Sequence, residues 1–295
     1  MKKIIMAMIG LISWPLFAQE VPADSVKLWT VGGNTSLTFN QVSLTNWSAG
    51  GKNSLAGTFL VNTYFNYKKD KVNWDNVIDL GYGLTKQGSD NSIKTEDKLN
   101  LASKFGYSAG KHWFYSVLLD FKTQMDVGYN DPPENTKKLS EFMAPAYLNF
   151  SFGMDYKPSD NFSLYMSPLT SKTTIVLDDS LSNVGAFGVK EGEKFREEYG
   201  ASVKVAARKT DLIKNVDFTT RLDLFSSLTN KPQNVDVDWE MAFNMKVNAH
   251  LTTILSFHAL YDDDIAYINK EGNPEGPRLQ FKQLFGFGIN YKFGK

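Results

Sequence analysis

Residues 235–247 read VDVDWEMAFNMKV, and the polarity of this stretch changes at every second residue. The odd-numbered positions, from Val235 to Val247, are all apolar. Five of the six even-numbered positions carry an acid, an amide or a lysine, and Ala242 is the sixth. Because successive side chains of a β-strand point to opposite faces, the stretch predicts a strand with one apolar and one polar side.

The same period of two recurs along most of the chain. Most of the runs exceed the roughly 9–11 residues that a tilted strand needs to cross a membrane, and no helical stretch is predicted between them. The sequence therefore predicts an all-β chain of about twelve antiparallel strands. Their expected spans are 29–41, 53–67, 72–86, 96–109, 112–126, 142–157, 162–176, 197–208, 215–229, 235–248, 251–264 and 279–293.

The gaps between the runs alternate in length. Short gaps, such as 110–111 and 249–250, follow the even-numbered runs, whereas longer gaps, such as 127–141 and 177–196, follow most odd-numbered ones. The gap at 230–234 is the exception. Short periplasmic turns and long extracellular loops are typical of transmembrane up-and-down barrels of the bacterial outer membrane. The rhythm predicts such a barrel in a Gram-negative envelope, with both termini in the periplasm.

The last run ends the chain with aromatic residues on one face. This pattern is similar to the C-terminal signal that the barrel-assembly machinery reads, although Gly294 and Lys295 follow the final aromatic residue. We therefore expect that machinery to be a partner during insertion, with outer-membrane lipids and lipopolysaccharide around the finished barrel. The residues on the shared face are Phe285, Phe287, Ile289, Tyr291 and Phe293.

The N-terminal residues predict a secretory signal peptide. Lys2 and Lys3 precede an apolar run from Ile4 to Phe17, and Ala18 fits a cleavage site. The apolar run is too short for a membrane-spanning helix of roughly 20 residues. The expected organisation is a signal peptide at 1–18, a short periplasmic segment at 19–28 and a barrel domain at 29–293.

Composition excludes several other classes of protein. Aromatic residues make up 14% of the 295 residues, while mean hydropathy is only −0.31, which suits a barrel with every second residue facing lipid. Without the two lysines of the signal peptide, 30 basic residues face 32 acidic ones, so no basic field for nucleic acid is expected. The absence of cysteine excludes disulfides and thiolate chemistry.

The predicted inner face is rich in charge of both signs. Mixed charges in a narrow space tend to pair, which predicts a lumen narrowed or sealed by salt bridges; a selective channel or a ligand pocket is the alternative. Lys122, Gln124, Arg221 and Asp223 are the candidate binding residues of this lumen. The other charged candidates are Lys98, Lys104, Lys204, Lys246, Asp75, Asp79, Asp120, Asp155, Asp217, Asp236, Asp238 and Glu240.

Catalytic chemistry has few candidates. Ser256 and His258 share the predicted inner face of one strand, and a serine with a histidine can form a hydrolytic site. Two ordinary polar lumen residues are the alternative interpretation. His112 and His250 fall in predicted periplasmic turns, far from surface lipid.

Two outer segments are candidate binding sites. Asp262, Asp263 and Asp264 lie at the outer rim, where clustered carboxylates can bind a divalent cation such as calcium; the start of a solvated loop is the alternative, and the EF-hand pattern is missing. In the first outer loop, the segment Asn46, Trp47, Ser48, Ala49, Gly50 and Gly51 joins a tryptophan to two glycines. The glycines permit a tight turn, and the tryptophan can anchor at the headgroups or cover the mouth of the barrel. The candidate binding residues of this loop are Asn46, Trp47, Gly50 and Gly51.

A set of short motifs resembles the domain-of-unknown-function family 3078 over roughly Trp29 to Phe293. The resemblance implies an outer-membrane barrel of the Bacteroidetes type, and because this family has no assigned activity it brings no catalytic residues. The motifs are Thr45 to Gly51, Trp74-Asp75-Asn76, Gly81-Tyr82-Gly83, Lys94-Thr95-Glu96-Asp97, Lys122-Thr123-Gln124, Ser167-Pro168-Leu169 and Tyr261-Asp262-Asp263-Asp264.

Together these observations predict a non-enzymatic outer-membrane barrel without a cofactor, apart from a cation at the acidic rim. Such a barrel would serve as a structural or accessory component of an outer-membrane complex, with an outer-membrane protein as a partner, or as a narrow pore. A surface-acting lipid or glycan hydrolase is an alternative, and a barrel that binds a ligand with its extracellular loops is another.

Overall fold

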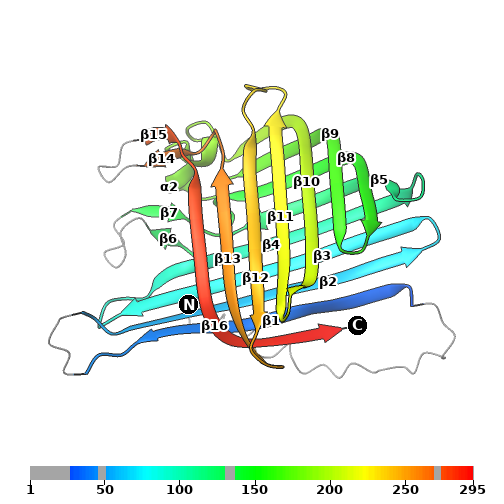
Figure 1. The fold of residues 1–295 in the computed structure, drawn as a ribbon. Coiled ribbons are helices and arrows are strands. Elements are labelled where there is room, and N and C mark those ends of the chain that lie inside the picture. Colours follow the sequence, from blue (N-terminus) through cyan, green and yellow to red (C-terminus); the bar gives the residue numbers. More distant parts are fainter. Residues whose placement is uncertain (1–26, 46–50, 130–136, 269–273, 295) are drawn as a thin grey trace, which may run out of the picture.

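The computed structural model describes residues 27–45, 51–129, 137–268 and 274–294. Within these residues, twelve antiparallel strands form one closed barrel in which β1 pairs with both β2 and β16 (Figure 1). The transmembrane barrel predicted from the alternation is confirmed. The predicted signal peptide at 1–18 and the segment at 19–28 fall almost entirely outside the described residues and stay predictions.

The twelve barrel strands match the twelve predicted runs. Their bounds are β1 Trp29–Val42, β2 Ser54–Lys69, β3 Val72–Gln87, β4 Ile93–Ser108, β5 Trp113–Thr123, β8 Ala146–Ser159, β9 Phe162–Ile175, β10 Phe195–Ile213, β11 Val216–Ser227, β12 Asp236–Lys246, β13 Leu251–Tyr261 and β16 Gln280–Gly294.

The connections divide the barrel into two unlike ends. At the end that we call the short-turn end, few residues separate the strands, as between β2 and β3 or between β8 and β9. At the opposite, long-loop end, the connections carry additional short elements, which gather on the left of Figure 1. These elements are β6 Gly128–Tyr129, β7 Lys138–Ser140, α2 Asp179–Ser182, η1 Ala186–Gly188, β14 Ala266–Ile268 and β15 Pro274–Pro277.

The two faces of the strands differ as the alternation predicts. On the outer face large apolar side chains are exposed, such as Trp239, Tyr115 and Phe287. On the inner face polar and charged side chains are buried, such as Asp120 and Asp155. An apolar outer belt around a polar interior is the architecture of outer-membrane barrels. The closed sheet fits the same setting, because strands in lipid satisfy all of their backbone hydrogen bonds only in a closed barrel.

Aromatic side chains cluster at the short-turn end. The ring centroid of Trp29 lies 5.2 Å from that of Tyr67 and 5.8 Å from that of Trp74. The ring of Trp113 lies 4.9 Å from that of Tyr156. Tryptophan and tyrosine favour the membrane–water interface, so this cluster marks one edge of the apolar belt.

Two strand boundaries differ from the prediction by four residues or more. The run predicted from 142 becomes regular strand only at Ala146, because Met143 adopts a positive φ of 59° and the following Pro145 has no N–H for a strand ladder. The strand predicted to end at 208 continues to Ile213. A register shift between Lys209 and Ile213 places extra residues of β10 opposite the start of β11.

The prediction of no helix between the strands is wrong for the loop after β9. This loop contains the one-turn helix α2, where Asp178 is the N-cap and accepts a hydrogen bond from the backbone N–H of Leu181 at 3.0 Å. One turn is too short to show a helical period in sequence. None of the helices among the described residues is long and apolar enough to span a membrane.

A small apolar core lies at the long-loop end. Ala144, Val176, Leu181 and Val189 are buried together, and Ala186 and Phe187 pack against them. We call this group the cap cluster, and the segments that carry it, 137–145 and 176–194, the cap.

The cap is also tied by charge. Lys138 Nζ lies 2.7 Å from Asp178 Oδ2 and 2.6 Å from Glu141 Oε2. Hydrogen bonds to Asp178 and Glu141 raise the pKa of Lys138 above its usual value. Burial opposes ionisation of Asp178, but hydrogen bonds from Lys138, Ser180 and the backbone of Leu181 outweigh it and hold the pKa of this carboxyl below its usual value.

Candidate lumen site

The candidate site lies on the inner faces of β12 and β13. The period of two places Asp236, Asp238 and Glu240 in a row down the inner face of β12. In the neighbouring strand, His258 is the register partner of Glu240. Directly paired residues of adjacent strands hold their Cβ atoms about 5 Å apart, so the backbone itself brings these side chains together.

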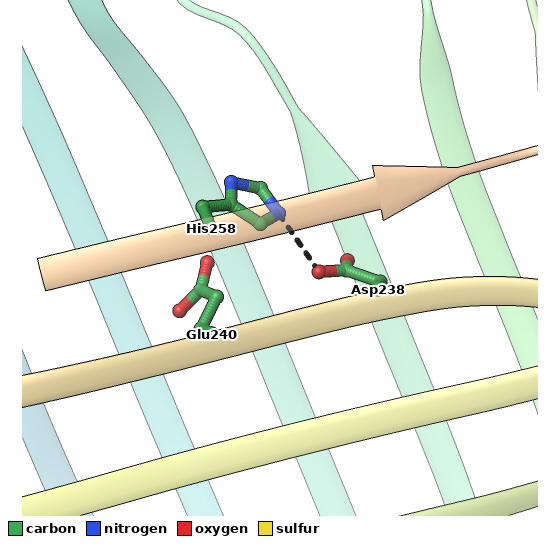
Figure 2. Close-up of side chains that lie close together, drawn as sticks. All are labelled: Asp238, Glu240 and His258. Carbon is green, nitrogen blue, oxygen red and sulfur yellow. Dashed lines mark hydrogen bonds and ion pairs between the residues drawn. The ribbon is translucent and has the colours of Figure 1, made fainter. Parts of the chain in front are cut away.

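Asp238, Glu240 and His258 form a compact cluster (Figure 2). His258 Nε2 lies 2.9 Å from Asp238 Oδ1, and one ligand atom from each of the three residues lies within 4.8 Å of the others. The three side chains are only partly buried, so the cluster faces open space in the lumen. A histidine between two carboxylates can hold a proton or a metal ion.

Lysines from other strands reach this cluster across the lumen. Lys122 on β5 lies 2.9 Å from a carboxylate oxygen of Asp238 and 2.9 Å from one of Asp223 on β11. Lys204 on β10 lies 2.9 Å from Asp223 and 2.6 Å from Asp120. Each of the two lysines therefore joins two carboxylates, and the charges form a connected network.

Two further ion pairs join opposite walls of the barrel. Lys98 on β4 lies 3.4 Å from Glu240 on β12, and Arg221 on β11 pairs with Asp79 on β3. In the closed order of twelve strands, each of these pairs links strands six positions apart, which is the largest separation possible. The lumen is therefore bridged from wall to wall at this level.

A glycine gives Lys98 its path along the wall. Gly81 on β3 is the register partner of Lys98, and a Cβ atom at Gly81 would come within 3.1 Å of Lys98 Cγ and 3.2 Å of Glu96 Cγ. The missing side chain leaves the space in which the lysine stem extends toward the opposite wall.

A second group of charges lies nearer the long-loop end. Lys172 Nζ lies 2.7 Å from Asp236 and 3.2 Å from Asp262. Between this group and the pairs of Lys122 and Lys204 lies a cavity of about 120 Å³. Its lining includes Lys122, Lys172, Lys204, Asp223, Asp236, Asp238, Asp262, Tyr147 and Tyr261. A cavity of this size has room for several water molecules.

Three of the four predicted lumen residues come together. Lys122 and Asp223 are in direct contact, and Arg221 belongs to the same layer of the lumen. Gln124 lies closer to the long-loop end, where its side-chain oxygen accepts hydrogen bonds from Lys94 Nζ at 3.2 Å and Ser140 Oγ at 2.7 Å. The binding roles of these residues stay predictions.

The weak catalytic candidates lie in the lumen. Ser256 is two residues before His258 on the same face of β13, but the ring of His258 forms its hydrogen bond with Asp238. The interior of the barrel is also separated from the lipid on which the predicted hydrolase would act. The catalytic role of Ser256 and His258 stays an untested prediction.

The three rim aspartates have three different partners. Asp262 contacts Lys172, Asp263 accepts a hydrogen bond from Asn234 at 2.5 Å, and Asp264 lies 3.0 Å from Arg196. A calcium ion there would have to displace these contacts. The predicted metal site stays a prediction.

Most of the predicted outer-loop site cannot be placed. Asn46, Trp47 and Gly50 lie outside the described residues. Gly51 is exposed and has a φ of 121°, in the region that favours glycine. Nearby, Asn53 Oδ1 accepts a hydrogen bond from Leu44 N–H at 2.7 Å, which closes the base of this loop.

Sequence reasoning missed some residues that complete the network. Lys172 is missing from the predicted inner face because the strand at 162–176 alternates poorly, with Ser171 and Thr173 on its outer side. Glu96 and Lys282 pair across the lumen at 2.8 Å. Both residues lie in predicted strands at positions that alternate toward the lumen, so the period of two could have identified them.

Residues 39–129 match the model of a family described as "Protein of unknown function (DUF3078)". No curated protein matches the chain.

Solved structures of outer-membrane proteins align with the chain at low identity and low TM-score. The translocator domain of the autotransporter NalP from Neisseria meningitidis is 7% identical, with a TM-score of 0.38 over 92% of this chain and 90% of that one. An outer-membrane channel from Pseudomonas putida F1 is 9% identical, with a TM-score of 0.40 over 93% and 100%. The NanC porin is 7% identical, with a TM-score of 0.37 over 90% and 99%.

These likenesses concern the barrel architecture and say nothing of activity. The family match covers the part of the chain from the end of β1 to β6, and it includes five of the motifs that suggested the resemblance. Residues 39–129 thus carry the sequence pattern of the DUF3078 family, and the resemblance predicted from the motifs is confirmed for this segment.

Proposed function

We propose that the protein is a non-enzymatic pore of the outer membrane that ion pairs hold closed, with the short-turn end facing the periplasm. The observation that carries the proposal is the pair of wall-to-wall bridges, Lys98 with Glu240 and Arg221 with Asp79. These bridges cross the lumen where an open channel would need a continuous water path.

The physics of ion pairs favours a closed but openable lumen. Separating a partly buried pair leaves two charges that have lost their partners, and this costs free energy unless water enters. Apolar packing would seal the lumen permanently, whereas ion pairs exchange their partners for water or passing ions. The cavity of about 120 Å³ lined by Lys122, Asp223 and Asp238 provides part of such a path.

Conductance through planar bilayers tests this proposal. The intact wild-type barrel should be almost silent, and the double variant Asp79→Ala/Arg221→Ala should conduct, because it removes one bridge together with both of its charges. The matched control is Lys104→Ala/Asp155→Ala. It deletes another lumen pair, 2.6 Å long, but this pair joins strands only two positions apart.

Heat-modifiable migration in detergent gels establishes that each variant is a folded barrel. Silence of the folded Asp79→Ala/Arg221→Ala variant would sink the pore proposal. Large, steady conductance of the wild type would contradict the closed state.

A second candidate is an accessory protein that binds an outer-membrane partner with its loops. The observation in its favour is that apolar side chains of the long-loop end are exposed, including Leu139, Phe142 and Val184. Exposed apolar groups on loops favour contact with another protein. Cross-linking in intact membranes should then capture one outer-membrane protein with the wild type and lose it with Phe142→Ser/Val184→Ser; an unchanged cross-link would contradict this candidate.

A further inference from the structure

We propose that Asp238, Glu240 and His258 bind a divalent transition-metal ion inside the lumen, with zinc as the representative ion. The inference goes beyond the proposed pore, because it does not depend on whether the lumen conducts. It rests on the geometry of the three side chains, on the charge around them and on the space beside them.

The distance between Asp238 and His258 fits two ligands of one metal. Zinc–oxygen and zinc–nitrogen bonds are about 2.1 Å long, so two ligand atoms at the tetrahedral angle around the metal lie about 3.4 Å apart. Asp238 Oδ1 and His258 Nε2 are separated by 2.9 Å. A displacement of about 0.5 Å between the two side chains therefore lets an ion take the place of their hydrogen bond.

Glu240 is placed to supply the third ligand. Its carboxylate lies within 4.8 Å of the other two ligand atoms, on the same face of β12 as Asp238 and in register with His258 (Figure 2). A small rotation of its side chain brings an oxygen into bonding distance. All three residues stand on paired strands, which hold the site more rigidly than loops would.

The contacts that a metal must displace are replaceable. Lys122 lies 2.9 Å from both Asp238 and Asp223, so it keeps Asp223 as a partner when a metal takes Asp238. Lys98 is 3.4 Å from Glu240, the longest ion pair in this layer of the described lumen.

The charges in this layer leave an unbalanced negative charge. Among the described residues, and leaving His258 aside, six acids and five bases take part in the ion pairs at this level. An added cation is therefore not repelled by an excess of positive charge, in spite of the lysines. The acids are Asp79, Glu96, Asp120, Asp223, Asp238 and Glu240, and the bases are Lys98, Lys122, Lys204, Arg221 and Lys282.

The donor set selects the class of metal, and the cavity completes the site. Imidazole nitrogen with two carboxylates suits zinc and neighbouring transition metals, whereas calcium and magnesium prefer oxygen ligands alone. Asp238 also lines the cavity of about 120 Å³, which gives space for water molecules at the remaining positions around the metal.

Calorimetric titration with zinc sulfate tests the site in untagged, full-length protein folded in detergent micelles. In a background of His112→Ala/His250→Ala, which removes the other histidines of the chain, zinc should bind at one site per barrel. His258→Ala should weaken this binding at least tenfold, and Glu240→Gln should weaken it as well. Calcium in place of zinc should give little binding heat.

Ser256→Ala is the matched control, because Ser256 lies on the same face of β13 two residues from His258. It should leave the zinc affinity unchanged. Cobalt provides a second readout: its visible absorption band should appear with the parent protein and be lost with His258→Ala. All variants must keep heat-modifiable migration.

Zinc affinity that is the same with and without His258 would overturn the proposal. So would the absence of binding to the folded parent protein at millimolar zinc. Neither result bears on the pore, since the variants that test the bridges leave Asp238, Glu240 and His258 intact.

Discussion

The lumen network and the cap are held together by opposite kinds of side chain. In the lumen, charged groups from facing walls meet, as Lys98 meets Glu240 and Arg221 meets Asp79. In the cap, Val176, Leu181 and Val189 are buried against one another, and charge contributes only at the edge through Lys138 and Asp178.

The cap and the lumen network should therefore respond differently to mutation, because apolar burial and ion pairs contribute to stability in different ways. Apolar burial is roughly additive over the area removed from water, so the cap should weaken gradually as its side chains are trimmed. A buried ion pair contributes little net stability while it is intact. Removal of only one of its two residues is costly, because the other charge stays buried without a partner. The lumen should therefore tolerate removal of both partners of a pair better than removal of one.

The largest effect should come from unpairing a buried lumen charge. Asp155 is almost fully buried and lies 2.6 Å from Lys104 Nζ. Asp155→Leu leaves the lysine without its carboxylate and should lower the free energy of unfolding by about 3 kcal/mol. Urea unfolding in lipid vesicles measures this. The double variant Asp155→Leu/Lys104→Met should recover most of the loss, and a double variant as unstable as the single one would contradict the comparison.

A somewhat smaller and local effect is expected from Leu181→Ala in the cap. Removing a buried leucine side chain should destabilise the closed cap by about 2 kcal/mol, because it deletes apolar contacts and leaves a gap. Hydrogen exchange should accelerate in residues 176–194 and stay unchanged in β12. Equal acceleration in both would show that the cap and the barrel open as one unit.

The cap should also loosen in acid. The pKa of Asp178 is lowered in the folded cap, so its contribution is present above the usual value of about 3.9 and is lost as the pH falls through the folded value. The pKa of Lys138 is raised in the folded cap, so the stability that Lys138 contributes is lost as the pH rises, and only in strong base.

A spin label can report the acid effect, because the chain has no cysteine of its own. A label at Val184→Cys should become more mobile between pH 5 and pH 2, whereas a label at Leu228→Cys in another loop should not. With Asp178→Asn the mobility at Val184→Cys should no longer depend on pH. A pH response that survives Asp178→Asn would assign the effect to another group.

The smallest effect should come from an exposed ion pair at the same end. Lys52 Nζ lies 2.8 Å from Asp90 Oδ2, but the lysine side chain is 62% exposed. Because water and salt screen such a pair, Lys52→Met should leave the unfolding midpoint unchanged within error. A clear shift would mean that contact length, and not burial, sets the strength of ion pairs in this protein.

The barrel was predictable because most of its strands repeat one local signal. A residue such as Trp239 needs lipid on one side while Asp238 and Glu240 need the interior on the other, so parity alone assigns their faces. The same parity suffices to assign Lys122, Arg221 and Asp223 to the lumen.

Which lumen charges meet was not predictable. That Lys98 reaches Glu240 depends on the tilt and stagger of strands on opposite walls, and no short-range pattern encodes either. The cap escaped prediction for another reason. Val176, Leu181 and Val189 are spaced by a one-turn helix and a 3₁₀ turn, so their burial leaves no regular period in the sequence.

The seam between β1 and β16 has a consequence for how the barrel forms. Leu37 pairs with Ile289 and Phe39 with Phe287, so the first strand finds its last neighbour at the far end of the chain. Loop closure over such a length makes folding slow. Until the final strand arrives, both edges expose unpaired backbone groups to any other strand nearby. The nascent chain therefore needs protection from aggregation for as long as its synthesis and transport last.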